Sequence, residues 1–316
     1  MNPAAGQSDS LDITALVCVY NGLPDIEDLL KSVLDQRTDQ LFRYEVLVVD
    51  NNSTDGTRDL VEQYATRYPD VLRVIEEKRQ GKSYALNTGL AAARGRICSI
   101  IDHDLVLPAS CLRGIWEAFS THPDVSFLGG KVLPIWPGPL PSWLTAEHWS
   151  PVAICDYGDT PRAVDSSASI CLLTGSFLRS GLLGIGGYRV ELGLRPGQLG
   201  GVEDDDVYTR LVRSGHCGIY IPEIVVYHKI GTQKLTKKYH RKWHTGHGRY
   251  YADMQLPSYE QSRWRIFGVP GHIYRQAAAH TLKWFNRTLR GGDGQAFSHE
   301  MQVRFCLGFV RQRWGL

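Results

Sequence analysis

The sequence predicts an α/β fold built on a mostly parallel sheet flanked by helices. Short apolar, β-favouring runs alternate with segments whose apolar residues have helical spacing, and each run ends in a polar or glycine-containing turn. The 316 residues, of which 43% are hydrophobic, are enough to bury a large core. Alternation of this length favours a parallel sheet that binds its ligands at the carboxyl ends of its strands.

Three strand-and-helix steps and a fourth strand fill the first hundred residues. The expected strands are 12–20, 44–49 and 72–75, with a fourth ending at residue 102, and the expected helices are 24–34, 58–68 and a third running from the turn at 80–83 to residue 93. The ends of parallel strands meet at one edge of a sheet. We therefore expect four polar side chains to share that edge: Tyr20, Asp50, Lys82 and Asp102.

Two carboxylates, Asp102 and Asp104, follow the fourth strand and flank His103. Such a pair is costly beside an apolar core unless positive charge compensates it. It suits a hard divalent cation that takes its other ligands from water and substrate phosphates. A solvated acidic turn explains the same two residues equally well.

Other motifs narrow the class of ligand without fixing it. The glycine-rich dinucleotide fingerprint and the P-loop are both absent. Asp50 could accept a hydrogen bond from a base or ribose, or simply cap the loop that follows it. The four acids 203–206 open a predicted helix, where capping and the helix dipole already favour negative charge, although four exceed what capping requires. His240, His244 and His247 have helical spacing, but no metal site is expected there because no cysteine or acid completes the set.

Cysteine usage and hydropathy predict a reducing compartment. The seven cysteines are odd in number and contain no Cys-x-x-Cys pair, so buried reduced thiols are expected. No secretory leader and no apolar stretch long enough to span a membrane is recognisable. We expect a cytoplasmic protein. A peripheral position on the inner face of the cell membrane is compatible with this expectation.

Charge is unevenly distributed along the chain. The formal net charge is only +2, but the residues from Lys229 onward are strongly basic and those before them are net acidic. Aromatic and basic residues mix at 273–289 and 303–314, which favours helices lying on an anionic membrane surface. Packing on the rest of the chain, a homodimer contact or a solvated basic surface are the alternatives.

Several motifs in order resemble the inverting family-two glycosyltransferases with the GT-A fold. The segments are 17–22, 48–57, 81–89, Asp-His-Asp at 102–104, 128–134, Gly-Gly-Tyr-Arg at 186–189, Glu-Asp-Asp-Asp with its helix at 203–213, and 225–228. Each segment is weakly specific alone, and the ordered set is strong. The resemblance covers roughly residues 12 to 250.

The resemblance implies roles for individual residues. Asp104 would bind Mn²⁺ or Mg²⁺ directly with His228 as a further ligand, although a lone histidine after a strand is more often structural. Asp204 would be the general base, oriented by Glu203. The nucleotide would be bound by five residues: Tyr20, Asp50, Lys82, Asn87 and Asp102.

The implied function is the metal-dependent transfer of a sugar, with inversion, from a nucleotide-diphosphate donor to a glycan or lipid-linked acceptor. A UDP-sugar is the favoured donor. Residues 11–228 would form the catalytic domain, with a nucleotide-binding half at 11–107 and an acceptor-binding half at 108–228, and 229–316 a basic helical region. No nucleic-acid partner is expected. The alternatives are a sugar-nucleotidyltransferase, which would need a glycine-rich basic loop after the first strand, and a non-catalytic glycan- or membrane-binding protein.

Overall fold

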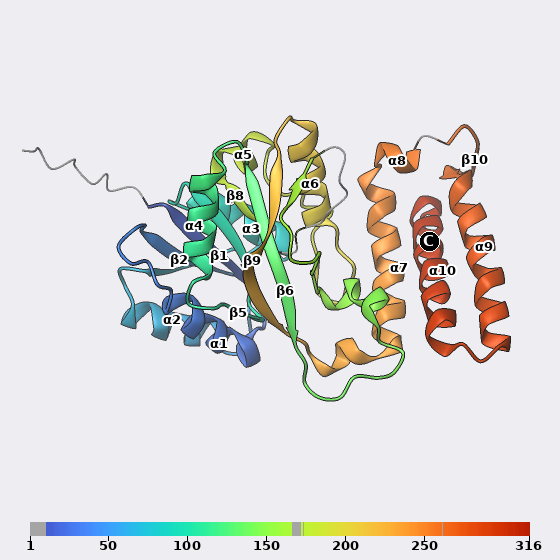
Figure 1. Ribbon diagram of the computed structural model, residues 1–316, viewed down its shortest axis with the longest axis horizontal. Helices are drawn as coiled ribbons and strands as arrows, with labels where there is room; N and C mark the ends of the chain where they lie inside the picture. The colour runs from blue at the N-terminus through green and yellow to red at the C-terminus, as the bar shows by residue number, and fades with distance from the viewer. Residues whose placement is uncertain (1–10, 166–171, 173, 261) are drawn as a thin grey trace, which may run out of the picture.

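A twisted mixed sheet with helices on both sides forms the larger part of the molecule, and a layer of long C-terminal helices stands beside it (Figure 1). The computed structural model describes residues 11–165, 172, 174–260 and 262–316. Within the described residues no helix is long and apolar enough to cross a membrane.

The sheet follows the order β3-β2-β1-β4-β8-β6-β9-β5, and β7 pairs with β9. Strands β3, β2, β1 and β4 are parallel, β6 is parallel to β9, and β8, β5 and β7 are antiparallel to their neighbours. The strands are β1 (Ile13–Val19), β2 (Tyr44–Asp50), β3 (Leu72–Glu76), β4 (Ile97–Asp102), β5 (Leu105–Val106), β6 (Phe127–Ile135), β7 (Arg162–Val164), β8 (Ser176–Leu178) and β9 (Gly218–Lys229).

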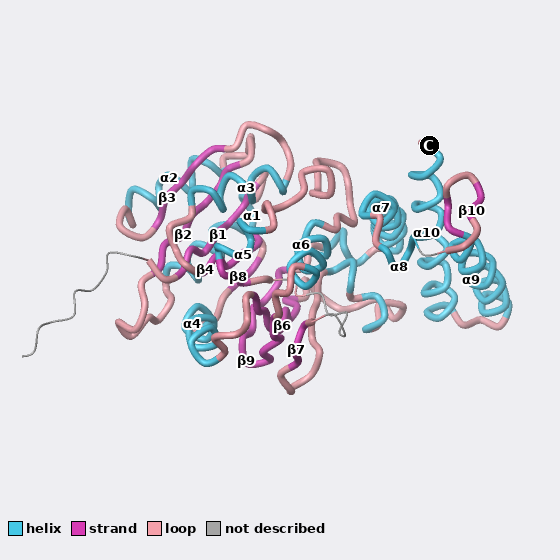
Figure 2. Tube along the Cα trace, turned by 90° about the horizontal axis from the view of Figure 1, so that it is seen from above, coloured by secondary structure: helices cyan, strands magenta, loops and turns pink. Residues whose placement is uncertain are grey.

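The helices cover the sheet and then form the C-terminal layer, as the view from above also shows (Figure 2). They are α1 (Leu23–Leu34), α2 (Thr57–Arg67), α3 (Lys82–Ala92), α4 (Cys111–Thr121), α5 (Arg179–Gly184), α6 (Glu203–Arg213), α7 (Lys237–Met254), α8 (Pro257–Glu260), α9 (Gly271–Leu289) and α10 (Asp293–Trp314), with short 3₁₀ turns η1 (Ala146–His148), η2 (Ser150–Val152) and η3 (Thr232–Leu235).

The main core forms because the central strands are apolar on both faces. Every residue of β1 except Cys18 is buried, and β2 and β4 are almost as enclosed. Both faces of a parallel sheet are covered by helices, so its strands are continuous apolar runs without polar alternation. The predicted fold class, a mostly parallel sheet flanked by helices with a helical C-terminal region, is confirmed.

The C-terminal layer has a small core of its own. Helices α7, α10 and α9 lie side by side (Figure 1), and a short hairpin of β10 (Arg265–Ile266) and β11 (Val269–Pro270) precedes α9. Five buried residues fill the contact: Ala252, Val269, Ile273, Cys306 and Phe309. The segments 273–289 and 303–314, expected to be helical, lie within α9 and α10, and each packs on one face against its neighbour.

Candidate active site

Seven of the nine predicted site residues line one cavity of about 650 Å³. They come from the ends of β1 and β4, the first turns of α3 and α6, and the end of β9, which meet at the edge predicted from the strand pattern. These residues are Tyr20, Lys82, Asp102, Asp104, Glu203, Asp204 and His228.

Asp104 and His228 come together because β5 pairs with β9. The pairing places Leu105 opposite His228, and the His228 Nε2 atom lies 3.0 Å from Asp104 Oδ2. Lys234 Nζ lies 3.0 Å from His228 Nε2 and 3.4 Å from Asp104 Oδ2. Burial alone would raise the pKa of Asp104, but the hydrogen bond with His228 and the charge of Lys234 hold it well below its usual value. A negative carboxylate beside an imidazole is thus the stable state of this pair.

The chemistry of this pair fits a divalent cation of a particular kind. The Lys234 ammonium shows that positive charge is accommodated beside the carboxylate and the imidazole. Among the described residues, no group of three or more histidine, cysteine, aspartate or glutamate side chains could hold a metal ion. Two protein ligands suit Mn²⁺ or Mg²⁺, which take their remaining ligands from water and phosphates, rather than an ion that needs a complete protein cage.

Lys82 holds the acidic side of the cavity together. Its Nζ atom lies 3.1 Å from Asp102 Oδ1 and 3.4 Å from Glu203 Oε1. Burial would lower the pKa of Lys82, but the carboxylates of Asp102, Asp204 and Glu203 raise it well above its usual value. Lys82 therefore stays charged at any physiological pH.

Asp204 is in a different electrostatic position. Burial raises its pKa to about 8, Lys82 opposes this rise, and the neighbouring Glu203 and Asp102 add to it. A general base is most effective when its pKa lies near the working pH. Asp204 therefore has the affinity for protons that a base at neutral pH needs.

The four acids at the start of α6 point to four different surroundings. Glu203 faces Lys82, Asp204 lines the cavity, Asp205 accepts a hydrogen bond from Tyr251 at 3.2 Å, and Asp206 pairs with Arg210 at 2.7 Å. None of these side chains caps the helix. Glu203 is only 4% exposed, and its Oε2 atom has no hydrogen-bond partner among the described residues. A buried acceptor without a partner is costly, so a ligand donor would stabilise it.

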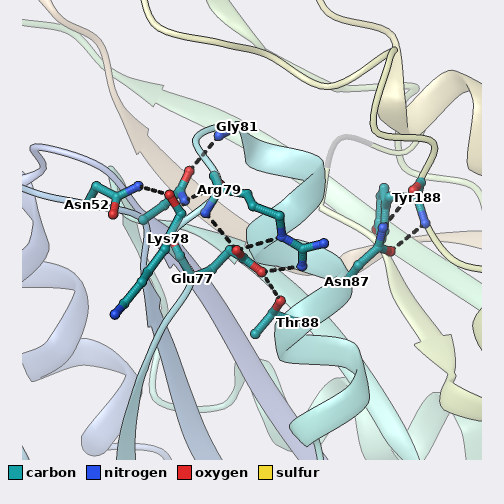
Figure 3. A network of polar contacts seen from close by, with 9 residues as sticks. Asn52, Glu77, Lys78, Arg79, Gly81, Asn87, Thr88 and Tyr188 are labelled. Atoms are coloured by element: carbon teal, nitrogen blue, oxygen red, sulfur yellow. Dashed lines mark hydrogen bonds and ion pairs between the residues drawn. The ribbon is translucent and has the colours of Figure 1, made fainter.

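A carboxylate outside the cavity lining fixes the loop that leads into α3 (Figure 3). Glu77 accepts hydrogen bonds from Arg79 through backbone and guanidinium nitrogens at 2.6–2.9 Å, and from the hydroxyl of Thr88. Hydrogen bonds from Arg79 are the main cause that lowers the pKa of Glu77 to about 2. Asn51 completes the support, since its Oδ1 accepts from the Gly81 N–H at 2.8 Å.

Replacing Glu77 with glutamine is expected to lower the free energy of unfolding by about 1–3 kcal/mol at pH 7, because charge-assisted hydrogen bonds are lost. Since the pKa of Glu77 is depressed in the folded state, its contribution is present above about pH 4.5 and is lost as the pH falls towards 2. Urea unfolding of both proteins between pH 3 and 7 measures this. A destabilisation of equal size at every pH would contradict the assignment.

Two predicted nucleotide-binding residues lie outside the cavity lining. Asp50 is buried at the end of β2, where its Oδ1 accepts from the Ser53 N–H at 3.3 Å. Asn87 is bound on both sides to the backbone of Tyr188, at 2.7 and 2.8 Å (Figure 3). The direct contacts that the family resemblance implies for these two residues stay predictions.

Other lining residues were not predicted from the sequence. Lys234, Tyr239 and Trp243, from η3 and α7, reach the cavity from the C-terminal region. No motif marks them, because they approach through packing distant in sequence. Three tryptophans of the segment after β6 pack outside the cavity lining: Trp136 and Trp149 around Val152 and Ile154, and Trp143 against His240 and Phe297.

His240, His244 and His247 all lie on α7, and among the described residues no group of three or more histidine, cysteine, aspartate or glutamate side chains is placed to hold a metal ion. His240 is buried with its Nε2 atom 3.0 Å from the Lys234 carbonyl oxygen, and His247 Nδ1 lies 3.1 Å from the Gly200 carbonyl oxygen. Cys18, Cys98, Cys111, Cys217 and Cys306 are free thiols, whereas Cys171 lies outside the described residues.

Comparison with known proteins defines the class to which this fold and site belong. The sequence profile of glycosyl transferase family 2 matches residues 14–177, slightly more than half of the chain. The chain belongs to this family. The family predicted from the ordered motifs is therefore confirmed.

Relatives show how far the likeness extends. Glycosyltransferase AglE of Haloferax volcanii is 36% identical over 121 residues, which are 38% of this chain and 39% of that protein. The glucosyl-dolichyl phosphate glucuronosyltransferase of the same organism is 24% identical over 70% of each chain. The dodecaprenyl-phosphate galacturonate synthase of Rhizobium johnstonii is 30% identical over 33% of this chain and 32% of that one. The chain thus spans less than half the length of most of these relatives.

Solved structures support the fold over nearly the whole chain. The mannosyltransferase PcManGT of Pyrobaculum calidifontis, in complex with GDP-Man and Mn²⁺, superposes with a TM-score of 0.63 at 20% identity, covering 98% of this chain and 88% of that one. S. aureus TarS 1-349 in complex with UDP gives a TM-score of 0.55 at 16% identity, covering 97% and 92%. At these identities the likeness concerns the fold.

Proposed function

We propose that this protein transfers a sugar from a nucleotide-diphosphate donor to an acceptor hydroxyl with inversion, using one divalent cation. The observation that carries the proposal is that Asp104, His228 and Asp204 line the same cavity. A cation-binding pair and a carboxylate with a pKa near 8 in one cavity are the two parts that this reaction requires.

Donor binding is assigned to the side of the cavity at the ends of β1 and β4. Tyr20 packs near the base, Asp102 contacts the ribose or a metal-bound water, and Lys82 lies close to the phosphates, with Asp50 and Asn87 as predicted further contacts. Asp104 and His228 would hold Mn²⁺ or Mg²⁺. When bound there, the ion would neutralise the charge that develops on the departing diphosphate.

Acceptor activation is assigned to Asp204. Its carboxylate takes the proton from the acceptor hydroxyl while that oxygen bonds to the anomeric carbon and the bond from this carbon to the phosphate oxygen breaks. The leaving group is the nucleoside diphosphate, and attack from the opposite side inverts the configuration without a covalent intermediate. Glu203, held by Lys82, orients Asp204 or a sugar hydroxyl through its free Oε2 atom.

Substrates are proposed from the relatives. A UDP-sugar is the favoured donor because TarS binds UDP, although PcManGT binds GDP-Man. A glycan or lipid-linked saccharide is the proposed acceptor, since two relatives are named for dolichyl and dodecaprenyl phosphates. Residues 11–228 would form the catalytic domain, with its nucleotide-binding half at 11–107 and its acceptor-binding half at 108–228. Residues 229–316 would form the basic region, from which Lys234 reaches the cavity.

A thermal-shift screen of nucleoside diphosphates, with and without Mn²⁺, tests the proposal. Selective binding stabilises the folded state by mass action, so one base with Mn²⁺ should raise the Tm most. No shift with any nucleotide would contradict the proposal and favour a non-catalytic glycan- or membrane-binding protein. Release of pyrophosphate from a nucleoside triphosphate and a sugar phosphate would indicate a sugar-nucleotidyltransferase.

The pH dependence of turnover should report Asp204. Because the proton must be absent for Asp204 to act as base, kcat/KM is expected to rise about tenfold per pH unit below the pKa of about 8 and to level off above it. Release of the nucleoside diphosphate, followed between pH 5.5 and 9.5, measures this. A flat profile through pH 6–9 would contradict the role of Asp204.

We also propose that the outer face of α9 binds the enzyme to a membrane surface. Leu282, Phe285 and Leu289 share one helical face and are 72%, 67% and 72% exposed. Lys283 and Arg287 flank them, and α9 contains no acidic residue. Exposed apolar side chains bordered by cations suit an anionic membrane surface. This face would hold the enzyme beside lipid-linked acceptors.

The double substitution Leu282→Asn and Phe285→Asn should reduce binding to phosphatidylglycerol vesicles more than tenfold, because burying each side chain contributes about 1.5–3 kcal/mol. Leu140→Asn, at an exposed site outside α9, is the control and should change nothing. Cosedimentation measures the binding. If the protein does not bind vesicles but forms a dimer that the double substitution dissociates, this face contacts a second subunit instead.

A further inference from the structure

A second cavity of about 620 Å³ adjoins the proposed active site. It lies between the loop 191–199 and the helices α7 and α10, and its lining is strongly basic. Two acidic residues, Glu191 and Asp253, stand against five cations: Arg195, Arg241, Lys242, Arg249 and Arg304.

The positive charge of this cavity is only partly neutralised. Arg241 and Arg304 share the single carboxylate of Glu300, at 2.7 and 3.2 Å. Within the part of the chain that the structure describes, no ion pair with an aspartate or glutamate involves Arg195, Lys242 or Arg249, although Arg249 donates a hydrogen bond to the main-chain oxygen of Leu316 at 3.1 Å. A cleft lined by surplus cations attracts anions.

The acids of the lining offset only part of this charge. Asp253 accepts two hydrogen bonds from Gln312 at 3.0 Å, and Glu191 is paired with Arg189 at 2.8 Å. Arg189 compensates the charge of Glu191, whereas the neutral amide of Gln312 leaves Asp253 with its negative charge. The excess of positive charge in the cavity is therefore available to a ligand.

The two cavities share part of their lining, and glycines hold this shared loop in place. Four residues line both cavities: Arg195, Gly197, Gln198 and Leu199. A Cβ atom on Gly246 of α7 would lie 2.0 Å from the Leu199 carbonyl oxygen, and one on Gly200, whose φ is +80°, would lie 2.4 Å from the His247 nitrogen. Backbone contacts this close require glycine, and they fix the loop against α7. A ligand in the second cavity therefore lies beside the cavity that holds Asp204.

We infer that the second cavity binds the phosphate of the acceptor, so that the acceptor is a phosphorylated, lipid-linked or free saccharide. This inference rests on the proposed function and names its acceptor class. Guanidinium groups form paired hydrogen bonds with the oxygens of a phosphate. A ligand with a single carboxylate would need fewer cations than this cavity contains, so the charge favours a phosphate. The saccharide would then extend along Arg195 and Gln198 towards Asp204.

Calorimetric titration at low ionic strength with two soluble probes, geranyl phosphate and α-glucose 1-phosphate, tests the inference. The double variant Lys242→Gln, Arg249→Gln should bind both probes at least about tenfold more weakly than the unmodified protein, because two charge-assisted contacts are lost. Both side chains are exposed, so the fold should persist with an unchanged Tm. Lys238→Gln is the matched control, since this exposed lysine of α7 lines neither cavity.

The outcomes separate the inference from the proposed function. Tighter binding of geranyl phosphate would support a lipid-borne phosphate, and equal binding would support recognition of the phosphate alone. Unchanged affinity in the double variant, an equal loss in Lys238→Gln, or no binding by the unmodified protein would overturn the inference. Nucleoside diphosphates should still raise the Tm of the double variant. The titration therefore tests the anion site, and the thermal shift tests the donor site independently of it.

Discussion

Replacing Asp204 with asparagine should reduce turnover by about a hundredfold to ten-thousandfold, while nucleoside-diphosphate affinity changes little. The amide keeps the shape of the side chain but cannot take a proton from the acceptor. The Mn²⁺-binding pair Asp104 and His228 stays intact in this variant. Single-turnover rates and nucleotide titrations on the same preparation measure the two effects.

The same variant should be more stable than the unmodified protein at high pH. Because burial raises the pKa of Asp204 to about 8, the folded state favours the neutral carboxyl, and the stability that this gives is lost as the pH rises towards 8. The neutral amide of the variant would carry no such penalty. Asp205→Asn is the matched control, since Asp205 faces Tyr251 outside the cavity. Equal loss of turnover in both variants would contradict the assignment of the base.

Replacing Asp104 with asparagine should weaken Mn²⁺-dependent nucleotide binding by about a hundredfold, because a charged ligand of the ion is lost. His228→Gln should produce a smaller loss of the same kind. Both predictions follow from the 3.0 Å contact between the two side chains. Titration of the selected nucleoside diphosphate with and without Mn²⁺ measures them.

Asp159→Asn provides the control for charge alone. Asp159 is on the surface, where it pairs with Lys131 away from the cavity, so nucleotide binding should be unaffected. If Asp104→Asn binds the nucleotide and Mn²⁺ as tightly as the unmodified protein, the cation site lies elsewhere. The ammonium of Lys234 would then be the natural partner of Asp104 in the active enzyme as well.

Much of the site could be predicted because parallel strands place their ends together. The positions of Tyr20, Lys82 and Asp102 follow from counting strands and turns, since each residue ends a strand, directly follows one or opens a helix at the same edge. Asp50 shows the limit of this argument. It ends its strand as expected, yet its side chain faces Ser53 and not the cavity.

Contacts that depend on distant pairing could not be predicted in this way. The approach of His228 to Asp104 requires the β5–β9 pairing. Before the structure, only the family resemblance implied that these two residues act together. Lys234 enters through η3, and the basic cavity is assembled from a loop, α7 and α10. Single-sequence periodicity carries no information on which face of α7 meets that loop. The close contact of Gly246 with Leu199 has no signal beyond an unexplained glycine in a helix.

The most direct test is a crystal structure with Mn²⁺ and the nucleoside diphosphate chosen by thermal shift, with the ion located by its anomalous scattering. The account predicts one Mn²⁺ bound to Asp104 and His228, with both phosphates on the same ion and the Asp204 carboxylate across the cavity from them. An ion bound away from these two side chains, or a diphosphate seated in the basic cavity beside α7, would contradict it.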